Sequence, residues 1–271
     1  MAASCTIRRG RRLCRMEKKP LPGPVAPDMR PRGDRVFHVK ICGVTTPEDA
    51  GMVAAAGADA IGLNFVTGSP RLLDLPRAQE VAAAIPAGVL RVGVFAGATV
   101  AEMLRIAAVL ALDAIQLHGH LDGTTEPVDP PERCRALAGL PVIRAVRLDG
   151  SRPDADALTA ARQWIAAAAA AGRAPAMVIV DAAVSRAAAP GRLGGTGERV
   201  DWAALARAGS LAVPMAVDGG LTPENVAEAI RITGLLAVDT ASGVEAAPGR
   251  KDPMKVRDFV AAARGAMGMI R

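Results

Sequence analysis

Short apolar runs rich in β-branched residues alternate along the chain with Ala-rich segments whose apolar positions recur every three or four residues. The short runs are typical of buried strands, and the Ala-rich segments have the period of helices that bury one face. From Phe37 onward the alternation repeats eight times. It predicts strands at 37–42, 59–65, 89–95, 113–117, 141–147, 176–181, 212–218 and 235–239. It predicts helices at 47–56, 76–85, 99–110, 131–138, 154–171, 201–208, 223–232 and 253–264, with N-terminal caps at Thr46, Thr99 and Thr222.

Strands that alternate with helices pair in parallel through crossovers, and eight such units close into a (β/α)8 or TIM barrel. We therefore expect one α/β domain over residues 37–271. An open doubly wound sheet is the alternative. It is disfavoured because the first strand-to-helix turn, CGVTTPED, lacks the pattern GxGxxG, and because eight units would be many for one nucleotide-binding fold.

Composition agrees with a large packed domain. Of the 271 residues 51% are hydrophobic, only 2% are aromatic and tyrosine is absent, so the core must be built mainly from Val, Ile, Leu and Ala. The net charge of +6 resembles that of a nucleic-acid-binding protein. However, residues 1–36 carry a net charge of +7 and residues 37–271 carry −1, so the predicted barrel is close to neutral.

The first 36 residues combine a basic run with a Pro-rich stretch and show neither the period of a strand nor that of a helix. They are interpreted as a disordered extension, either a solvated tail or sequence upstream of a true start at Met16 or Met29. A transit peptide and an anchor for an anionic surface are the alternatives, because both are rich in arginine and poor in acids.

Four cysteines (Cys5, Cys14, Cys42 and Cys134) are scattered without CxxC or another metal spacing, and no apolar signal segment precedes them. The longest apolar stretch, 164–171, is far shorter than the roughly 20 residues of a membrane span. We expect a soluble cytoplasmic protein without a membrane partner.

Polar residues stand at the carboxyl ends of the predicted strands, where TIM barrels carry their active sites. They are Cys42, Asn64, Gln116 with His118, Arg147, Asp181, Asp218 and Asp239. Strand alternation places Val39 and Ile41 toward the helices and His38, Lys40 and Cys42 inside the barrel. Because the first and last strands are neighbours after closure, we expect Lys40 and Asp239 to form an ion pair.

Two glycine-containing loops follow the seventh and eighth predicted strands: DGGLTPENV at 218–226 and DTASGVE at 239–245. Glycine lets backbone N–H groups approach a phosphate closely, and a helix N-terminus favours the anion. A lone Gly-Gly pair would more often be a simple turn. Two such loops in the last two units favour a phosphate site, since barrels commonly bind phosphate there.

Cys42 and Asp181 are the candidate reactive groups. A free cysteine is usually buried and inert, but Cys42 ends a strand directly before a glycine, and Lys40 could favour its thiolate. Asp181 closes the apolar run MVIVD and needs a partner if it is buried. The glycine-rich segment GRLGGTGERVDW that follows is long enough to act as a lid. His118 and His120 lack metal spacing and are interpreted as loop or substrate contacts.

From Val39 to about Arg264 the chain resembles the phosphoribosylanthranilate isomerase family of tryptophan biosynthesis. The matching segments occur in the family's order and are KICGVTTPEDA, GADAIGLNF, SPR, RVGVF, IQLHG, VIVD, GGTG, GGLTPENV, VDTASGVE and PGRKD. SPR or GGTG alone is weak, but KICG, QLHG, GGLTPENV and SGVE together are highly specific.

The resemblance implies an Amadori rearrangement of a phosphorylated small-molecule substrate, with Cys42 as general base and Asp181 as general acid. It implies that Arg71 binds the anthranilate carboxylate and that the backbone at Gly219, Gly220, Ser242 and Gly243 holds the phosphate. The further predicted substrate contacts are Gln116, His118, Gly195 and Asp239. No metal or organic cofactor is implied, and the protein is expected to be a monomer or homodimer.

The sequence departs from the family pattern in its basic extension and at Asp218, where a small residue is usual. The second departure brings a carboxylate near the predicted phosphate site, which would weaken binding unless Lys40 or an arginine pairs with it.

Two rival functions remain. Another phosphate-binding barrel, such as ribulose-phosphate 3-epimerase, is suggested by VDGG at 217–220, but such enzymes use paired acids and metal-binding histidines at strand ends. A nucleic-acid or anionic-ligand binder would use the basic extension and would need neither Cys42 nor Asp181.

Overall fold

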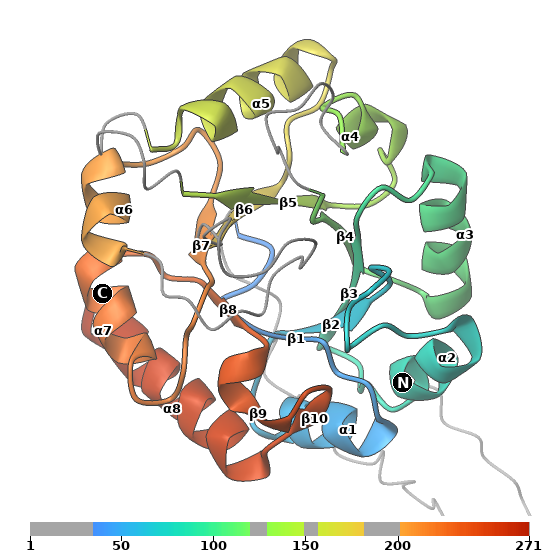
Figure 1. Ribbon diagram of the computed structural model, residues 1–271, viewed down its shortest axis with the longest axis vertical. Coiled ribbons are helices and arrows are strands. Elements are labelled where there is room, and N and C mark those ends of the chain that lie inside the picture. Colours follow the sequence, from blue (N-terminus) through green and yellow to red (C-terminus); the bar gives the residue numbers. More distant parts are fainter. Residues whose placement is uncertain (1–34, 120–128, 149–156, 182–200, 271) are drawn as a thin grey trace, which may run out of the picture.

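A computed structural model describes residues 35–119, 129–148, 157–181 and 201–270. Eight parallel strands close into a barrel in sequence order, with β1 paired to both β2 and β8 (Figure 1). The strands are β1 (Val39–Cys42), β2 (Ala60–Asn64), β3 (Leu90–Phe95), β4 (Ala114–Leu117), β5 (Val142–Arg147), β6 (Met177–Asp181), β7 (Met215–Val217) and β8 (Val238–Thr240). All eight predicted strands are present, so the predicted barrel is confirmed.

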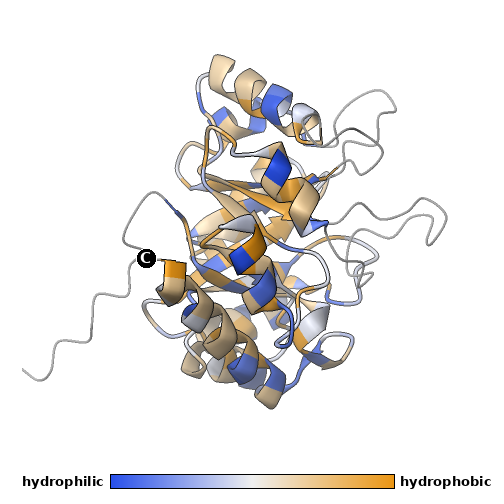
Figure 2. Ribbon diagram, turned by 90° about the vertical axis from the view of Figure 1, so that its left-hand side faces the viewer, coloured by the Kyte–Doolittle hydropathy of each residue, from blue (hydrophilic) through white to orange (hydrophobic). Residues whose placement is uncertain are grey.

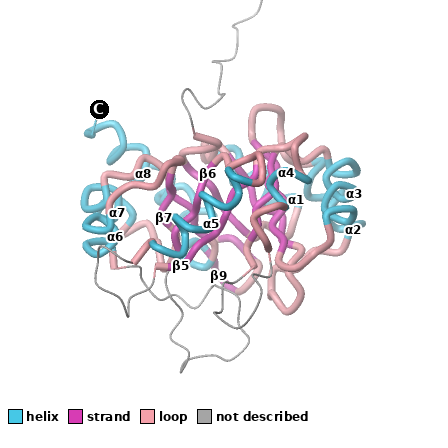
Figure 3. Tube along the Cα trace, turned by 90° about the horizontal axis from the view of Figure 1, so that it is seen from above, coloured by secondary structure: helices cyan, strands magenta, loops and turns pink. Residues whose placement is uncertain are grey.

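Helices surround the barrel in Figure 1, and Figure 3 shows them flanking the strands from a second direction. They are α1 (Pro47–Ala55), α2 (Leu75–Ala83), α3 (Val100–Leu110), α4 (Arg133–Ala136), α5 (Thr159–Ala170), α6 (Trp202–Ala208), α7 (Val226–Thr233) and α8 (Pro253–Ile270). None of the helices in the described part of the chain is long and apolar enough to cross a membrane.

Two of the three predicted helix caps are confirmed. The Thr46 and Thr99 side chains accept hydrogen bonds from Asp49 N and Glu102 N, which satisfies donors that the helix itself cannot. The predicted cap at Thr222 is wrong. Asn225 bonds to Thr222 N and to the carbonyl of Gly220, which holds the residues before it in a turn and starts α7 at Val226.

The predicted alternation of faces is confirmed for β1. Val39 and Ile41 belong to a large apolar cluster between strands and helices, and Figure 2 shows hydrophobic strands inside more polar helices. A smaller cluster inside the barrel includes Phe37, and Val36 packs against this cluster. His38 is half-buried, with its Nδ1 2.7 Å from the carbonyl oxygen of Leu236. The inward position expected for His38 is therefore not confirmed, because Phe37 takes the place inside the barrel and regular alternation begins only at Val39.

A short antiparallel hairpin that the sequence did not predict follows β8. A turn of 3-10 helix, η2 (Ser242–Val244), leads into β9 (Glu245–Ala247), which pairs with β10 (Arg250–Lys251). Figure 1 places the hairpin beside α1. It brings the side chains of Glu245 and Lys251 together, and this determines the geometry of one part of the candidate site.

Candidate active site

Lys40 and Asp239 meet inside the barrel. The register of β1 and β8 sets the two residues side by side, and Lys40 Nζ lies 2.6 Å from Asp239 Oδ2 with both side chains buried. Burial lowers the pKa of Lys40, but the charge and hydrogen bond of Asp239 together with the neighbouring Cys42 and Asp218 outweigh it, so the pKa is raised and the ammonium form is retained. The predicted ion pair is confirmed.

Cys42 ends β1 directly above this pair. Its neighbour across the ladder is Gly62, where a Cβ would lie 2.8 Å from the Cys42 Sγ, so the glycine provides the space for the thiol. Burial raises the pKa of the Cys42 thiol, and the positive charge of Lys40 offsets only part of this. Lys40 therefore favours the thiolate as expected, but it does not bring the pKa below its ordinary value.

Asp181 ends β6, is buried, and lies in register with Arg147 of β5. Burial lowers the pKa of Arg147 against the attraction of the Asp181 carboxylate. Going round the closed barrel, β7 and β8 separate β6 from β1. Asp181 and Cys42 therefore stand on different sides of the barrel mouth.

Asp218 follows β7 between these groups. Its Oδ1 accepts a 2.7 Å hydrogen bond from the N–H of Gly219, and the described residues contain no cation in contact with it. Burial, with the neighbouring charges of Asp239 and Asp181, raises the pKa of Asp218 well above its usual range. The expected partner Lys40 is engaged by Asp239, and the Gly219 N–H predicted to hold phosphate is engaged by Asp218.

The two predicted phosphate loops contact each other. Gly219 and Gly220 have φ of 88° and 63°, a conformation that favours glycine. A Cβ on Gly243 would overlap the carbonyl oxygen of Leu221, to which the Thr240 hydroxyl also donates, at 2.8 Å. Gly243 is thus required for the close approach of η2 to the turn after β7, and Gly219 and Gly220 for the backbone conformation of that turn.

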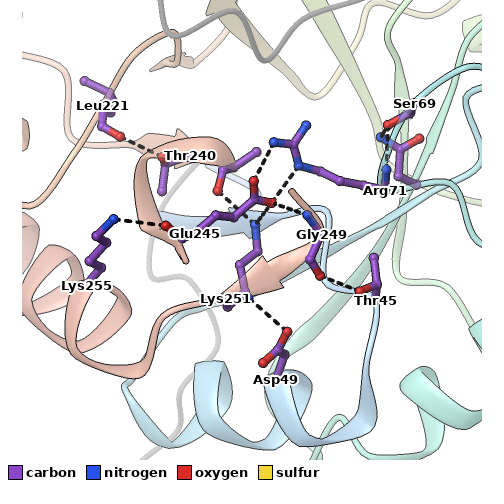
Figure 4. Close-up of polar contacts among 12 residues, drawn as sticks. Thr45, Asp49, Ser69, Arg71, Leu221, Thr240, Glu245, Gly249, Lys251 and Lys255 are labelled. Atoms are coloured by element: carbon purple, nitrogen blue, oxygen red, sulfur yellow. Dashed lines mark hydrogen bonds and ion pairs between the residues drawn. The ribbon is translucent and has the colours of Figure 1, made fainter. Parts of the chain in front are cut away.

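Arg71 lies in a buried charged cluster with Glu245 and Lys251 (Figure 4). Its Nε and Nη2 each donate a 2.7 Å hydrogen bond to one carboxylate oxygen of Glu245. Lys251 Nζ lies 3.0 Å from Glu245 Oε1. Burial alone would raise the pKa of Glu245, but these cations outweigh it and the pKa is lowered.

The structure describes the remaining predicted substrate contacts only in part. Gln116 is buried at the end of β4, with its Nε2 3.3 Å from His118 Nδ1, and its Oε1 has no partner among the described residues. Gly195 lies outside the described residues, as does most of the predicted lid. Within the part of the chain that is described, no group of three or more His, Cys, Asp and Glu side chains is arranged to hold a metal ion.

Comparison with known proteins shows the family of the chain. The sequence pattern of the family described as N-(5'phosphoribosyl)anthranilate (PRA) isomerase matches residues 39–262. The N-(5'-phosphoribosyl)anthranilate isomerase of Neisseria meningitidis is 42% identical over 229 residues, which cover 84% of this chain and 97% of that protein. That of Myxococcus xanthus is 42% identical over 227 residues, which cover 84% and 96%.

Solved structures are similar as well. The phosphoribosyl anthranilate isomerase of Thermotoga maritima has a TM-score of 0.69 and 32% identity, with 84% of this chain and 99% of that chain covered. A phosphoribosyl anthranilate isomerase in complex with reduced 1-(o-carboxyphenylamino)-1-deoxyribulose 5-phosphate has a TM-score of 0.65 and 31% identity, with the same coverage.

A closed barrel whose ionisable side chains gather at the carboxyl ends of its strands defines the class, a TIM-barrel enzyme. The family pattern spans most of the chain, and the match to a relative 42% identical covers 84% of this chain and 97% of that relative. The chain belongs to the N-(5'-phosphoribosyl)anthranilate isomerase family. The resemblance found in the sequence is thereby confirmed.

The sequence did not reveal the roles of Glu245 and Lys251. Both stand within matching segments, SGVE and GRKD, and their opposite charges were visible. The pairing depends on the β9–β10 hairpin, which is too short and too weakly apolar to be predicted from its sequence pattern.

Proposed function

We propose that this chain catalyses the Amadori rearrangement of N-(5-phosphoribosyl)anthranilate to 1-(2-carboxyphenylamino)-1-deoxyribulose 5-phosphate, the isomerase step of tryptophan biosynthesis. Beyond family membership, the observation that carries the proposal is the placement of Cys42 and Asp181. They end strands β1 and β6 on different sides of the barrel mouth. A reaction that adds a proton at one atom and removes one at another needs an acid and a base so arranged.

In the proposed mechanism Asp181 donates a proton to the furanose ring oxygen, the bond between this oxygen and C1 breaks, and an iminium forms between C1 and the aniline nitrogen. The Cys42 thiolate then removes the proton from C2. The released electron pair forms a C1–C2 double bond and neutralises the nitrogen. The resulting enolamine tautomerises to the ketone, so substrate and product are isomers.

The electrostatics around Cys42 support its role as base. The thiol has a raised pKa, so its thiolate is a minority species at neutral pH, but a strongly basic one. Lys40 stabilises the thiolate without competing for the proton, because its own pKa is raised by Asp239. The Lys40 ammonium is therefore a fixed positive charge beneath the base, and the Asp239 carboxylate that holds it opposes part of its effect on the thiol.

The phosphate and the carboxylate of the substrate would bind in different places at the barrel mouth. The backbone at Gly220, Ser242 and Gly243 would hold the phosphate, in the loops where barrels commonly bind it. Asp218 stands at this site, but its raised pKa favours the neutral acid and so limits repulsion of the phosphate. Arg71 would bind the anthranilate carboxylate.

The direct test is an assay of the purified protein with N-(5-phosphoribosyl)anthranilate, whose fluorescence disappears as the product forms. We expect saturable turnover that does not depend on an added metal ion. Absence of turnover in a protein that is folded by circular dichroism would contradict the proposal. Epimerisation of ribulose 5-phosphate by the same sample would favour the rival barrel function.

A further inference from the structure

Among the described residues, the guanidinium of Arg71 is bound along one edge only. Nε and Nη2 donate to the two oxygens of Glu245, which is the side-on bidentate arrangement. Within the described residues Nη1 has no hydrogen-bond partner, because the other contact of Arg71 is its backbone N–H to Ser69. The second edge, formed by Nη1 and the remaining hydrogen of Nη2, can therefore accept another carboxylate in the same plane.

Glu245 is itself fixed in place. Its Oε1 accepts from Lys251 Nζ at 3.0 Å and from the Gly249 N–H at 3.3 Å, both contributed by the β9–β10 hairpin. Its backbone carbonyl accepts from Lys255 Nζ of α8, also at 3.0 Å. Figure 4 shows the cations converging on the Glu245 carboxylate from two directions. The Glu245 carboxylate, which accepts the two hydrogen bonds from Arg71, thus has little freedom to move.

The aliphatic part of Arg71 is confined as well. Gly43 follows Cys42 with φ of 69°, and a Cβ built there would overlap the Cδ of Arg71. The side chain therefore passes over the glycine of KICG on its way to Glu245. Gly43, which follows the predicted base, thus confines the aliphatic part of Arg71, and Glu245 of the hairpin holds its guanidinium.

The charges of the cluster do not balance. Arg71 and Lys251 carry two positive charges against the one negative charge of Glu245, and all three residues are buried. Asp49 contacts only the backbone N–H of Lys251. A buried excess of positive charge is costly until an anion arrives, so this cluster favours a ligand that brings one carboxylate.

We propose that Glu245 is a positioning residue that presents the free edge of Arg71 to the ortho carboxylate of the substrate, and so selects carboxylated anilines over plain ones. This inference rests on the proposed function, since it assumes that Arg71 faces the anthranilate ring. A purely structural ion pair would stabilise the fold without changing the preference between two ligands, and this difference makes the two roles separable.

The test is isothermal titration of the whole chain with two ligands. One is reduced 1-(o-carboxyphenylamino)-1-deoxyribulose 5-phosphate, and the other is its phenylamino counterpart without the carboxylate. The ratio of the two Kd values is the readout. Partial unfolding of a variant weakens both ligands equally and leaves this ratio unchanged, so the test stays valid for a destabilised protein.

We expect Glu245→Gln to raise the Kd of the carboxylated ligand by roughly 10-fold or more, and that of the phenylamino ligand by less than about 3-fold. Glu245→Asp, which keeps the charge but shortens the reach, should change the ratio in the same direction. Glu80→Gln is the matched control. Glu80 also pairs with an arginine, Arg77, but on the exposed face of α2, so the ratio should stay at the wild-type value.

Each other outcome has a defined meaning. If Glu245→Gln weakens both ligands equally, or neither, while Arg71→Ala abolishes the preference for the carboxylated ligand, the positioning role is overturned and the role of Arg71 stands. If Arg71→Ala leaves the preference intact, the carboxylate binds elsewhere and the positioning role falls with it. If the wild type binds neither ligand, the proposed function itself fails.

Discussion

Lys40 of β1 and Asp239 of β8 form a buried ion pair, with 2.6 Å between Nζ and Oδ2, at the seam where the barrel closes. Replacing one member leaves the other charge buried without a partner. We expect Lys40→Met to lower the free energy of unfolding by about 3–5 kcal/mol, measured by urea denaturation. Lys40→Met combined with Asp239→Asn should recover part of that loss. A loss below about 1 kcal/mol for the single variant would show that the pair is not buried as described.

Asp218 should destabilise the folded protein at neutral pH. The pKa of Asp218 is raised on folding, so as pH rises the unfolded chain releases this proton before the folded protein does. Below the unfolded pKa both states hold the proton and Asp218 costs no stability. Above it, the free energy of unfolding falls by up to about 1.4 kcal/mol per pH unit until the folded pKa is reached. Asp218→Asn keeps the acceptor for the Gly219 N–H without titrating. Relative to wild type, the variant should therefore gain more in Tm at pH 7 than at pH 4. An equal gain at both pH values would contradict the raised pKa.

The pH profile of turnover should follow the Cys42 thiol. Because burial raises its pKa, kcat is expected to increase with pH through neutrality and to fall about tenfold per unit on the acid side. Once the pH exceeds its own raised pKa, the Asp218 carboxylate raises the pKa of Cys42 further, so Asp218→Asn should shift the upper part of the rising limb toward lower pH. A kcat independent of pH between 6 and 9 would exclude thiolate formation as the titrating event.

Arg71→Ala should mainly raise KM. A bidentate contact with the anthranilate carboxylate acts equally in the ground state and the transition state, so its loss weakens binding without slowing the proton transfers. We expect KM to rise roughly 10-fold or more and kcat to change only a few-fold, measured by the fluorescence assay. An unchanged KM would remove Arg71 from the substrate site.

The sequence predicted those features that depend on strand periodicity and on the order of the strands. The eight strands, the outward faces of Val39 and Ile41 and the contact of Lys40 with Asp239 all follow once eight parallel strands close. Helix boundaries that are set by side-chain hydrogen bonds could not be predicted from the periodicity. Asn225 caps its own turn and delays α7, which a cap assigned to Thr222 from its spacing could not anticipate.

Contacts between charged side chains were also beyond the sequence. Arg71 was singled out, but its partner Glu245 lies 174 residues away and reaches it only through an unpredicted hairpin. Asp218 was recognised as a departure from the family pattern. That Lys40 pairs with Asp239 and leaves Asp218 to accept from the Gly219 N–H depends on side-chain positions that the sequence does not show. The predicted contact at Gly195 lies outside the described residues and stays a prediction.

The most direct test of the account is kcat for Cys42→Ala and Asp181→Asn, measured with saturating N-(5-phosphoribosyl)anthranilate. The loss of a positioned base or acid typically lowers a rate by roughly 10² to 10⁴. Each variant should therefore lose at least about that factor in kcat with little change in KM, because neither group holds the phosphate. Near wild-type turnover by Cys42→Ala would contradict the account, and the C2 proton would then have to be removed by another strand-end group such as Asp218.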